Sequence, residues 1–260
     1  MGILNITPDS FYDGGKYKTE SSILLQVERM LTEGATFIDL GAYSSRPGAD
    51  DINEDEELSR IAPILEKLIQ KFPDILISVD TFRSTIAKEC IGIGACMVND
   101  ISAGELDPNM FETMAELQVP YIVMHMPGNP KTMQKHTKYK DLVKEIIHYL
   151  ANKVAALRKL GLNDIIIDPG FGFGKTMDQN YELLNKLELF QFMELPLMVG
   201  MSRKSMFYKM LNSSPEKALN ATTVGHTLAI QKGCNLIRTH DVREAVETIR
   251  ILSKLKQIDL

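Results

Sequence analysis

Short apolar strands alternate with helical segments eight times along this chain of 260 residues, and this alternation constrains the fold more than any other feature. In the helical segments, apolar residues recur every three or four positions, which is the spacing of a helix that packs on one face. Strict alternation implies a parallel sheet, because each crossover must return the chain to the same end of the sheet. The expected strands cover residues 2–4, 36–40, 75–79, 96–98, 121–124, 165–167, 197–199 and 235–237.

Eight such units, with no change of composition between them, predict an α/β fold that closes into a (β/α)8 TIM barrel. We expect a single domain that covers residues 1–260. A doubly wound open sheet is the main alternative, because it uses the same alternation. The last helix is expected to turn Val242, Val246, Ile249 and Leu252 inward. The expected helices cover residues 22–32, 54–72, 84–91, 109–117, 139–160, 180–189, 215–232 and 241–252.

Composition excludes several classes of protein. With 44% hydrophobic and 24% charged residues, the chain can build a large core and is not disordered. The net charge of −5 argues against a nucleic-acid partner, whose phosphates favour a basic surface. We find no apolar run of transmembrane length and no signal peptide, so we expect a cytoplasmic protein without a membrane partner. The odd set Cys90, Cys96 and Cys234 lacks CxxC spacing and predicts reduced core cysteines.

Polar residues stand at the carboxyl ends of most expected strands. In a barrel of this kind all these ends face one mouth. Each residue alone has a simple structural explanation, such as capping the helix that follows. Their coincidence at one mouth favours a functional site. The residues are Asn5, Asp80, Asn99, His125, Asp168, Lys204, Arg238 and His240.

The chemistry of these side chains suggests a ligand with two different parts. The carboxylates of Asp80 and Asp168 and an asparagine amide can bind a flat heterocycle that carries both donors and acceptors. Lys204, Arg238 and His240 form a cationic corner that suits a phosphate or diphosphate. The glycine-rich stretch GFGFGKT lacks the spacing of a nucleotide-binding P-loop.

Eight blocks in order along the chain resemble the dihydropteroate synthase family. They read GILNITPDSFYDGG, SSRPGAD, ISVDTFRS, VNDIS, MHM, DPGFGFGKT, MSRKS and IRTHDV. The resemblance implies a barrel, usually a homodimer, that joins 4-aminobenzoate to 6-hydroxymethyl-7,8-dihydropterin diphosphate and releases diphosphate in folate synthesis. It also implies Mg²⁺ as the cofactor, and sulfonamide drugs as competitors of the aminobenzoate.

The same resemblance assigns expected roles, matched motif by motif. The catalytic residues would be Asp13, Asp80, Asp168 and Lys204. The pterin would contact Asp80, Asn99, Ile101, Met124, Asp168, Phe173, Gly200 and Lys204. The diphosphate would contact Asn5, Arg238 and His240, and Asn5 would also meet the Mg²⁺. The aminobenzoate would contact Phe11, Ser45, Arg46, Pro47 and Ser205.

The chain departs from the usual family pattern at several positions. Tyr43 replaces an acidic residue, Ser45 replaces a threonine, and Met126 makes the position after His125 apolar. Arg203 has no expected role in the site, and we expect it to point away into an ion pair. The chain also begins almost inside its first strand, where family members usually have a preceding hairpin. This start suggests a missing hairpin and a less stable barrel floor.

Two other functions remain open from the sequence. One is a pterin-binding methyltransferase that handles methyltetrahydrofolate, and the other is a pterin-binding paralogue without catalysis. The SRK block around Lys204 and the long first loop favour the synthase, because a methyl donor has no diphosphate to hold.

Overall fold

All eight expected strands are present in the computed structural model, which describes residues 1–6, 20–43 and 52–256. They are short and mostly buried, as strands are when both faces of a parallel sheet are covered. They are β1 (Gly2–Asn5), β2 (Phe37–Gly41), β3 (Leu76–Asp80), β4 (Met97–Asp100), β5 (Tyr121–Met124), β6 (Ile165–Asp168), β7 (Met198–Val199) and β8 (Leu236–Ile237).

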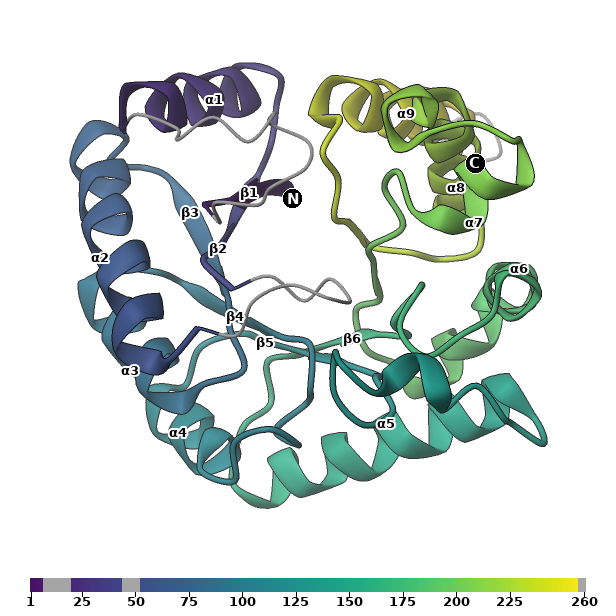
Figure 1. The fold of residues 1–260 in the computed structure, drawn as a ribbon, viewed down its shortest axis with the longest axis horizontal. Helices are drawn as coiled ribbons and strands as arrows, with labels where there is room; N and C mark the ends of the chain where they lie inside the picture. Colours follow the sequence, from purple (N-terminus) through teal and green to yellow (C-terminus); the bar gives the residue numbers. More distant parts are fainter. Residues whose placement is uncertain (7–19, 44–51, 257–260) are drawn as a thin grey trace.

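The strands close into a ring. β1 to β6 pair in parallel in chain order, and β7 pairs in parallel with β8. Two parallel bridges join these sheets, Gly2 with Thr239 and Ile167 with Leu197. The helices surround the strands in chain order (Figure 1). The predicted closed barrel is therefore confirmed, and the open doubly wound sheet is excluded.

The helices follow the expected order, but several of their ends differ from the prediction. The helix expected over 139–160 begins at Leu142, where the side chain of Asp141 accepts a hydrogen bond from the backbone N–H of Lys144. The helix expected over 180–189 begins earlier, behind a capping box of Thr176 and Gln179. The helices are α1 (Glu20–Thr32), α2 (Glu54–Lys71), α3 (Ser84–Ile93), α4 (Met110–Leu117), α5 (Leu142–Lys159), α6 (Met177–Asn185), α7 (Ser205–Met210), α8 (Leu219–Gln231) and α9 (Val242–Lys256). Short 3-10 turns are η1 (Met133–Lys135), η2 (Leu187–Met193) and η3 (Pro215–Lys217).

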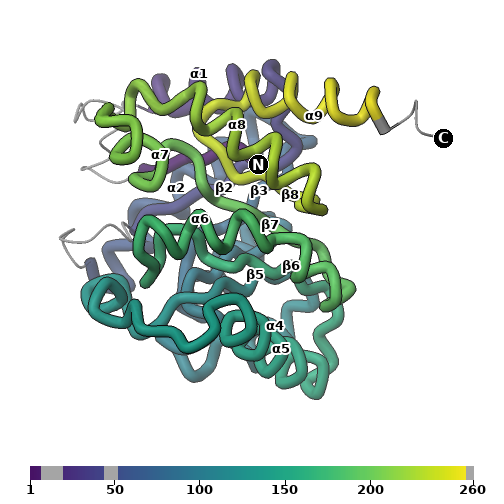
Figure 2. The backbone as a smooth tube through the Cα atoms, turned by 90° about the vertical axis from the view of Figure 1, so that its right-hand side faces the viewer, coloured from purple at the N-terminus to yellow at the C-terminus, as the bar shows by residue number. Residues whose placement is uncertain are grey.

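The last helix, α9, lies along the same edge of the molecule as α1 (Figure 2). Val242 and Leu252 are buried, as expected. The expectation for Ile249 is wrong, because its side chain is 42% exposed. The buried stripe passes instead through Ala245 and Thr248, so Ile249 lies beyond its edge.

Packing divides into layers around the strands. One large apolar cluster joins β1 to β3 with α1, α2, α3 and α9, and another joins β4 to β8 with α4 to α8. A smaller cluster gathers side chains from the strands and from the residues just before them, including Met97, Ile122 and Met198. Cys90 and Cys234 are buried and Cys96 is half-buried, and all three are free thiols, as predicted. In the described part of the chain, no helix combines the length and apolarity needed to cross a membrane.

Burial of a histidine in α8 makes a prediction about pH. His226 is 2% exposed, and burial lowers its pKa from 6.5 to about 4. Unfolding therefore takes up a proton between these values, so stability is lost as the pH falls from 6.5 towards 4. Relative to His226→Gln, the unfolding free energy of the wild type should drop by about 2 kcal/mol between about pH 7 and about pH 4.5. Denaturant titrations at both pH values measure this difference.

The matched control is His148→Gln, on the exposed face of α5. It should follow the wild-type pH curve. Parallel pH curves for the wild type and His226→Gln would contradict the buried, neutral state of this imidazole.

Candidate active site

Arg238 joins three strands at the barrel mouth. It directly follows β8, and its Nε donates to Oδ2 of Asp39 at 2.5 Å. Its second terminal nitrogen donates to Oδ2 of Asp80 at 2.7 Å. One guanidinium therefore serves two carboxylates, one from β2 and one from the end of β3. This trio carries a net negative charge when both carboxylates are ionised.

Asp39 also contacts β4, two strands away in the sheet. It is fully buried, and its Oδ2 accepts a second hydrogen bond from Nδ2 of Asn99 at 3.0 Å. Its other oxygen, Oδ1, has no hydrogen-bond partner within the described residues. Sequence reasoning missed Asp39, because it sits inside an apolar strand and not at the end. A charged residue in such a strand was the available signal, since an unpaired buried carboxylate is costly.

Burial changes the proton affinities of these groups. Burial raises the pKa of Asp80 to about 7, with the charge of Arg238 opposing the shift and that of Asp39 adding to it. Burial alone would lower the pKa of Arg238. The negative charges of Asp39 and Asp80 outweigh this effect, so the pKa of Arg238 is raised. The arginine therefore stays cationic, while Asp80 can hold or release a proton near neutral pH.

Asp168 and Lys204 face the same mouth from β6 and from the residues after β7. Asp168 is 3% exposed, and its Oδ1 accepts the backbone N–H of Gly170 at 2.7 Å. The Nζ of Lys204 donates to the carbonyl of Phe171 and lies 4.5 Å from the ring centroid of Phe173. Burial raises the pKa of Asp168 and lowers that of Lys204 to about 8, and in each case the partner charge opposes the shift.

Gly200 lies next to Arg238 and Asp168. A Cβ at this position would be 3.8 Å from Cδ of Arg238 and 3.9 Å from Oδ2 of Asp168. Gly200 therefore presents its backbone to the space that those two side chains border. The structure thus brings together the predicted polar residues of the pterin group, which are Asp80, Asn99, Asp168 and Lys204, with Gly200 beside them.

An apolar cluster, here called the apolar wall, lies beside Lys204. Ile101, Met124, Met126 and Met133 form one buried cluster, and Phe173 packs against it. Three of the predicted pterin contacts, Ile101, Met124 and Phe173, therefore share this wall. Met126 is 2% exposed within it, so the position after His125 serves packing in this chain.

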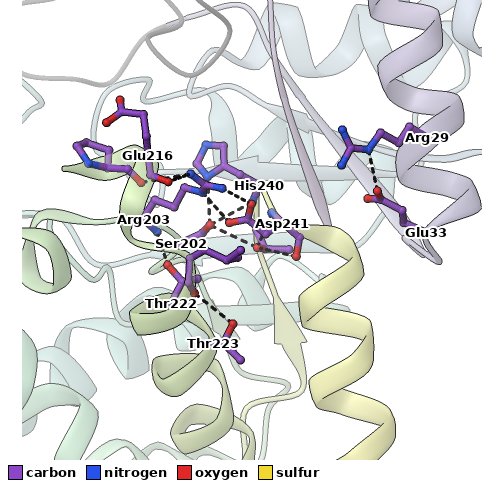
Figure 3. A network of polar contacts seen from close by, with 12 residues as sticks. Arg29, Glu33, Ser202, Arg203, Glu216, Thr222, Thr223, His240 and Asp241 are labelled. Atoms are coloured by element: carbon purple, nitrogen blue, oxygen red, sulfur yellow. Dashed lines mark hydrogen bonds and ion pairs between the residues drawn. The ribbon is translucent and has the colours of Figure 1, made fainter. Parts of the chain in front are cut away.

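The segment around Arg203 links the ends of β7 and β8 (Figure 3). Arg203 binds both carboxylate oxygens of Asp241, at 2.5 and 2.7 Å, and donates to the carbonyl of Glu216 at 3.0 Å. The expected ion pair pointing away from the site is therefore confirmed. Next to it, the Oγ of Ser202 accepts the backbone N–H of His240 and lies 3.2 Å from its Nδ1. These contacts hold the loops that carry Lys204 and His240 as one unit.

The remaining predicted residues divide into two groups. Asn5 ends β1, which neighbours β8 in the ring, and Ser205 is exposed at the first turn of α7. The described residues contain no cluster of three or more His, Cys, Asp or Glu that could hold a metal ion. Five predicted residues lie outside the described part of the chain, namely Phe11, Asp13, Ser45, Arg46 and Pro47.

This arrangement can bind a planar heterocycle by both edges. Asp80 and Asp168 offer acceptors, Asn99 and Lys204 offer donors, and the apolar wall offers a face. Arg238 and His240 lie at the carboxyl end of β8, where they can meet an anionic group attached to such a ring.

Comparisons with known proteins agree with this geometry. Residues 1–240 match the family described as pterin binding enzyme. The dihydropteroate synthase of Escherichia coli (strain K12) is 42% identical over 254 residues, which cover 97% of this chain and 89% of that protein. The structure of the Yersinia pestis dihydropteroate synthase with a sulfonamide drug is similar, with a TM-score of 0.94 and 41% identity, over 98% of this chain and 93% of that one. The Xanthomonas albilineans dihydropteroate synthase with 4-aminobenzoic acid has a TM-score of 0.90 and 34% identity, over 98% and 92% of the two chains.

The ion pair of Arg203 yields a stability prediction. Both side chains of this pair are 13% exposed, so Arg203→Met leaves a largely buried carboxylate without its partner. We expect the unfolding free energy to fall by about 3 kcal/mol. The reason is that the carboxylate of Asp241 then stays desolvated without the opposite charge that compensates it. The double variant Arg203→Met/Asp241→Asn should recover part of this loss. Chemical denaturation measures all three proteins.

The matched control is Arg60→Met on α2, which breaks a pair with Glu56, whose side chain is 45% exposed. It should cost about 0.5 kcal/mol or less. Equal losses for Arg203→Met and Arg60→Met would contradict a structural role for the buried pair.

Proposed function

Because this chain belongs to the pterin-binding enzyme family, we propose that it is a dihydropteroate synthase. It would condense 6-hydroxymethyl-7,8-dihydropterin diphosphate, hereafter pterin diphosphate, with 4-aminobenzoate, giving 7,8-dihydropteroate and diphosphate. The observation that carries the proposal is the convergence of Asp80, Asn99, Asp168 and Lys204 at one barrel mouth, where Lys204 lies against Phe173 of the apolar wall. The dihydropteroate synthase of Escherichia coli, which is 42% identical over nearly the whole chain, supports it.

The pterin ring would bind by its polar edges. One oxygen of Asp168 accepts the backbone N–H of Gly170, which fixes the orientation of the carboxylate. The other oxygen remains available to ring N–H groups. Lys204 and Asn99 would donate to ring acceptors. Ile101, Met124 and Phe173 would cover the face of the ring.

The diphosphate would bind at the end of β8. Arg238 is held in place by Asp39 and Asp80, and Ser202 holds His240, so both side chains are fixed before the ligand arrives. Fixed charges that meet the developing charge of a leaving group lower the barrier most effectively.

Asn5 would contact a Mg²⁺ that accompanies the diphosphate. Its amide oxygen is a hard ligand of the kind that Mg²⁺ accepts, and Mg²⁺ commonly takes few protein ligands besides substrate phosphates. A single amide oxygen at the end of β1 therefore fits a metal held mainly by the substrate. When bound, Mg²⁺ would supply positive charge to the leaving oxygens.

The reaction would proceed by loss of diphosphate before attack by the amine. Cleavage of the C–O bond leaves a cation delocalised over the pterin, and the carboxylates of Asp80 and Asp168 would stabilise it. The arylamine nitrogen then forms the new C–N bond and loses a proton. Because an arylamine is only weakly basic, this proton leaves without a strong base. By the family resemblance, Asp13 would assist catalysis, and Phe11, Ser45, Arg46, Pro47 and Ser205 would contact the aminobenzoate.

Two further proposals concern partners. Sulfonamides would compete with the aminobenzoate, since the Yersinia pestis relative is known in complex with such a drug. The chain would act as a homodimer. Several large apolar side chains on α7 and α8 favour this assembly, because they are exposed in one chain. They are Met210, Leu211, Val224 and Leu228.

The test is release of diphosphate from pterin diphosphate in the presence of 4-aminobenzoate and Mg²⁺. We expect Lys204→Ala and Asp168→Ala each to lower pterin binding and turnover by about a hundredfold or more, because each leaves a buried partner unpaired. Lys186→Ala and Asp178→Ala, at exposed positions, are the matched controls and should keep wild-type rates. Near-wild-type rates in Lys204→Ala or Asp168→Ala would contradict these roles.

The same assay separates the other functions. A methyltransferase that handles methyltetrahydrofolate would release no diphosphate. A paralogue without catalysis would bind the pterin and leave it unchanged.

A further inference from the structure

Lys175 is a buried lysine with no role in the proposed reaction. Its side chain is 4% exposed, and its Nζ donates to the carbonyls of Gly170 at 2.8 Å and Phe173 at 3.0 Å. The same Nζ lies 3.0 Å from Nδ1 of His125. Burial lowers the pKa of Lys175 to about 7, with the charge of Asp168 opposing the shift. In its ammonium form the group has three hydrogens, and these three uncharged acceptors use all of them. Such complete bonding at a buried amine indicates a specific structural purpose.

The two carbonyls enclose the segment that holds Lys204. The N–H of Phe173 donates to the carbonyl of Gly170 at 3.2 Å, which closes a turn over residues 170–173. Within this turn, the carbonyl of Phe171 accepts from Lys204, and the ring of Phe173 lies against the same ammonium. The N–H of Gly170 binds Asp168. Lys175 therefore holds in place the turn that contacts Asp168 and Lys204.

His125 anchors this arrangement to the barrel. Its backbone N–H donates to the carbonyl of Asp168 at 3.0 Å, and its ring meets that of Tyr149 edge-on at 5.0 Å. Burial, together with the charge of Lys175, lowers the pKa of His125 to about 2. The imidazole is therefore neutral, and acceptance by Nδ1 places its hydrogen on Nε2.

We propose that Lys175 is a positioning residue for pterin binding, which acts by holding the 170–173 turn against Lys204. This inference rests on the proposed function of the barrel mouth. Lys175 touches neither the ring nor the diphosphate in this account. Its effect passes through the carbonyl of Phe171 and the ring of Phe173. A lysine that only filled space would tolerate methionine, which has a similar length and no donors.

The test compares Lys175→Met with the wild type. We expect pterin diphosphate to bind about 10- to 100-fold more weakly by titration calorimetry without aminobenzoate, because the turn loses two hydrogen bonds to Lys175 and its link to His125. In the full reaction, KM for pterin diphosphate should rise while KM for aminobenzoate stays near the wild-type value. Lys144→Met, at an exposed position of α5, is the matched control. Unchanged pterin affinity in a folded Lys175→Met protein would overturn the proposal.

Two measurements keep the proposal testable if Lys175→Met fails to fold. Lys175→Gln retains N–H donors, so it should bind pterin diphosphate more tightly than a variant without donors, such as Lys175→Leu. Equal binding by the two variants would count against the proposal. Nitrogen-15 NMR of the wild type should show His125 as the neutral Nε2–H tautomer between about pH 6 and about pH 8. A protonated Nδ1 would overturn it.

The outcome for Lys175 is independent of turnover. A wild-type protein that binds pterin diphosphate without releasing diphosphate would contradict the proposed function. The affinity of Lys175→Met would still decide the positioning role.

Discussion

The mouth of the barrel depends on one buried arginine that serves two carboxylates. Arg238 crosses from β8 to Asp39 on β2 and Asp80 on β3, and Asp39 in turn receives the amide of Asn99 from β4. Without the guanidinium, two neighbouring buried carboxylates would repel each other and would have to take up protons. With it, four strands present polar groups in fixed directions. The pocket can therefore be polar at its edge and still be built on an apolar barrel.

Loops outside the strands are held by the same kind of interaction. Arg203 ties the segment after β7 to Asp241 after β8, and Lys175 ties the loop after β6 to His125 after β5. Lys175 is 4% exposed and the side chain of Arg203 is 13% exposed, and each reaches a partner in a neighbouring loop. Lys204 directly follows Arg203 in the chain and donates to Phe171 in the loop that Lys175 holds. Both contacts therefore determine its position. A lysine that must meet a ligand can in this way remain desolvated and correctly aimed.

Periodicity predicted the eight strands, their order and the closure of the barrel, because these follow from local hydrophobic patterns and chain chirality. Strand-end positions also predicted that Asp80, Asn99, Asp168 and Lys204 meet, since a barrel sends all these ends to one mouth. Asp39 was not foreseen, because its role depends on a partner 199 residues away. The inward face of Ile249 was wrong, because a stripe of apolar residues leaves the exact rotation of a helix undetermined.

A crystal structure of this chain with bound pterin diphosphate would show directly whether these side chains hold the pterin. We expect the pterin to lie on the wall of Met124 and Phe173, with its edges hydrogen-bonded to Asp168 and Lys204. Arg238 should keep its contact with Asp39 while the diphosphate lies at the end of β8. A pterin bound elsewhere, or one in this pocket without contact to Asp168 and Lys204, would contradict this expectation.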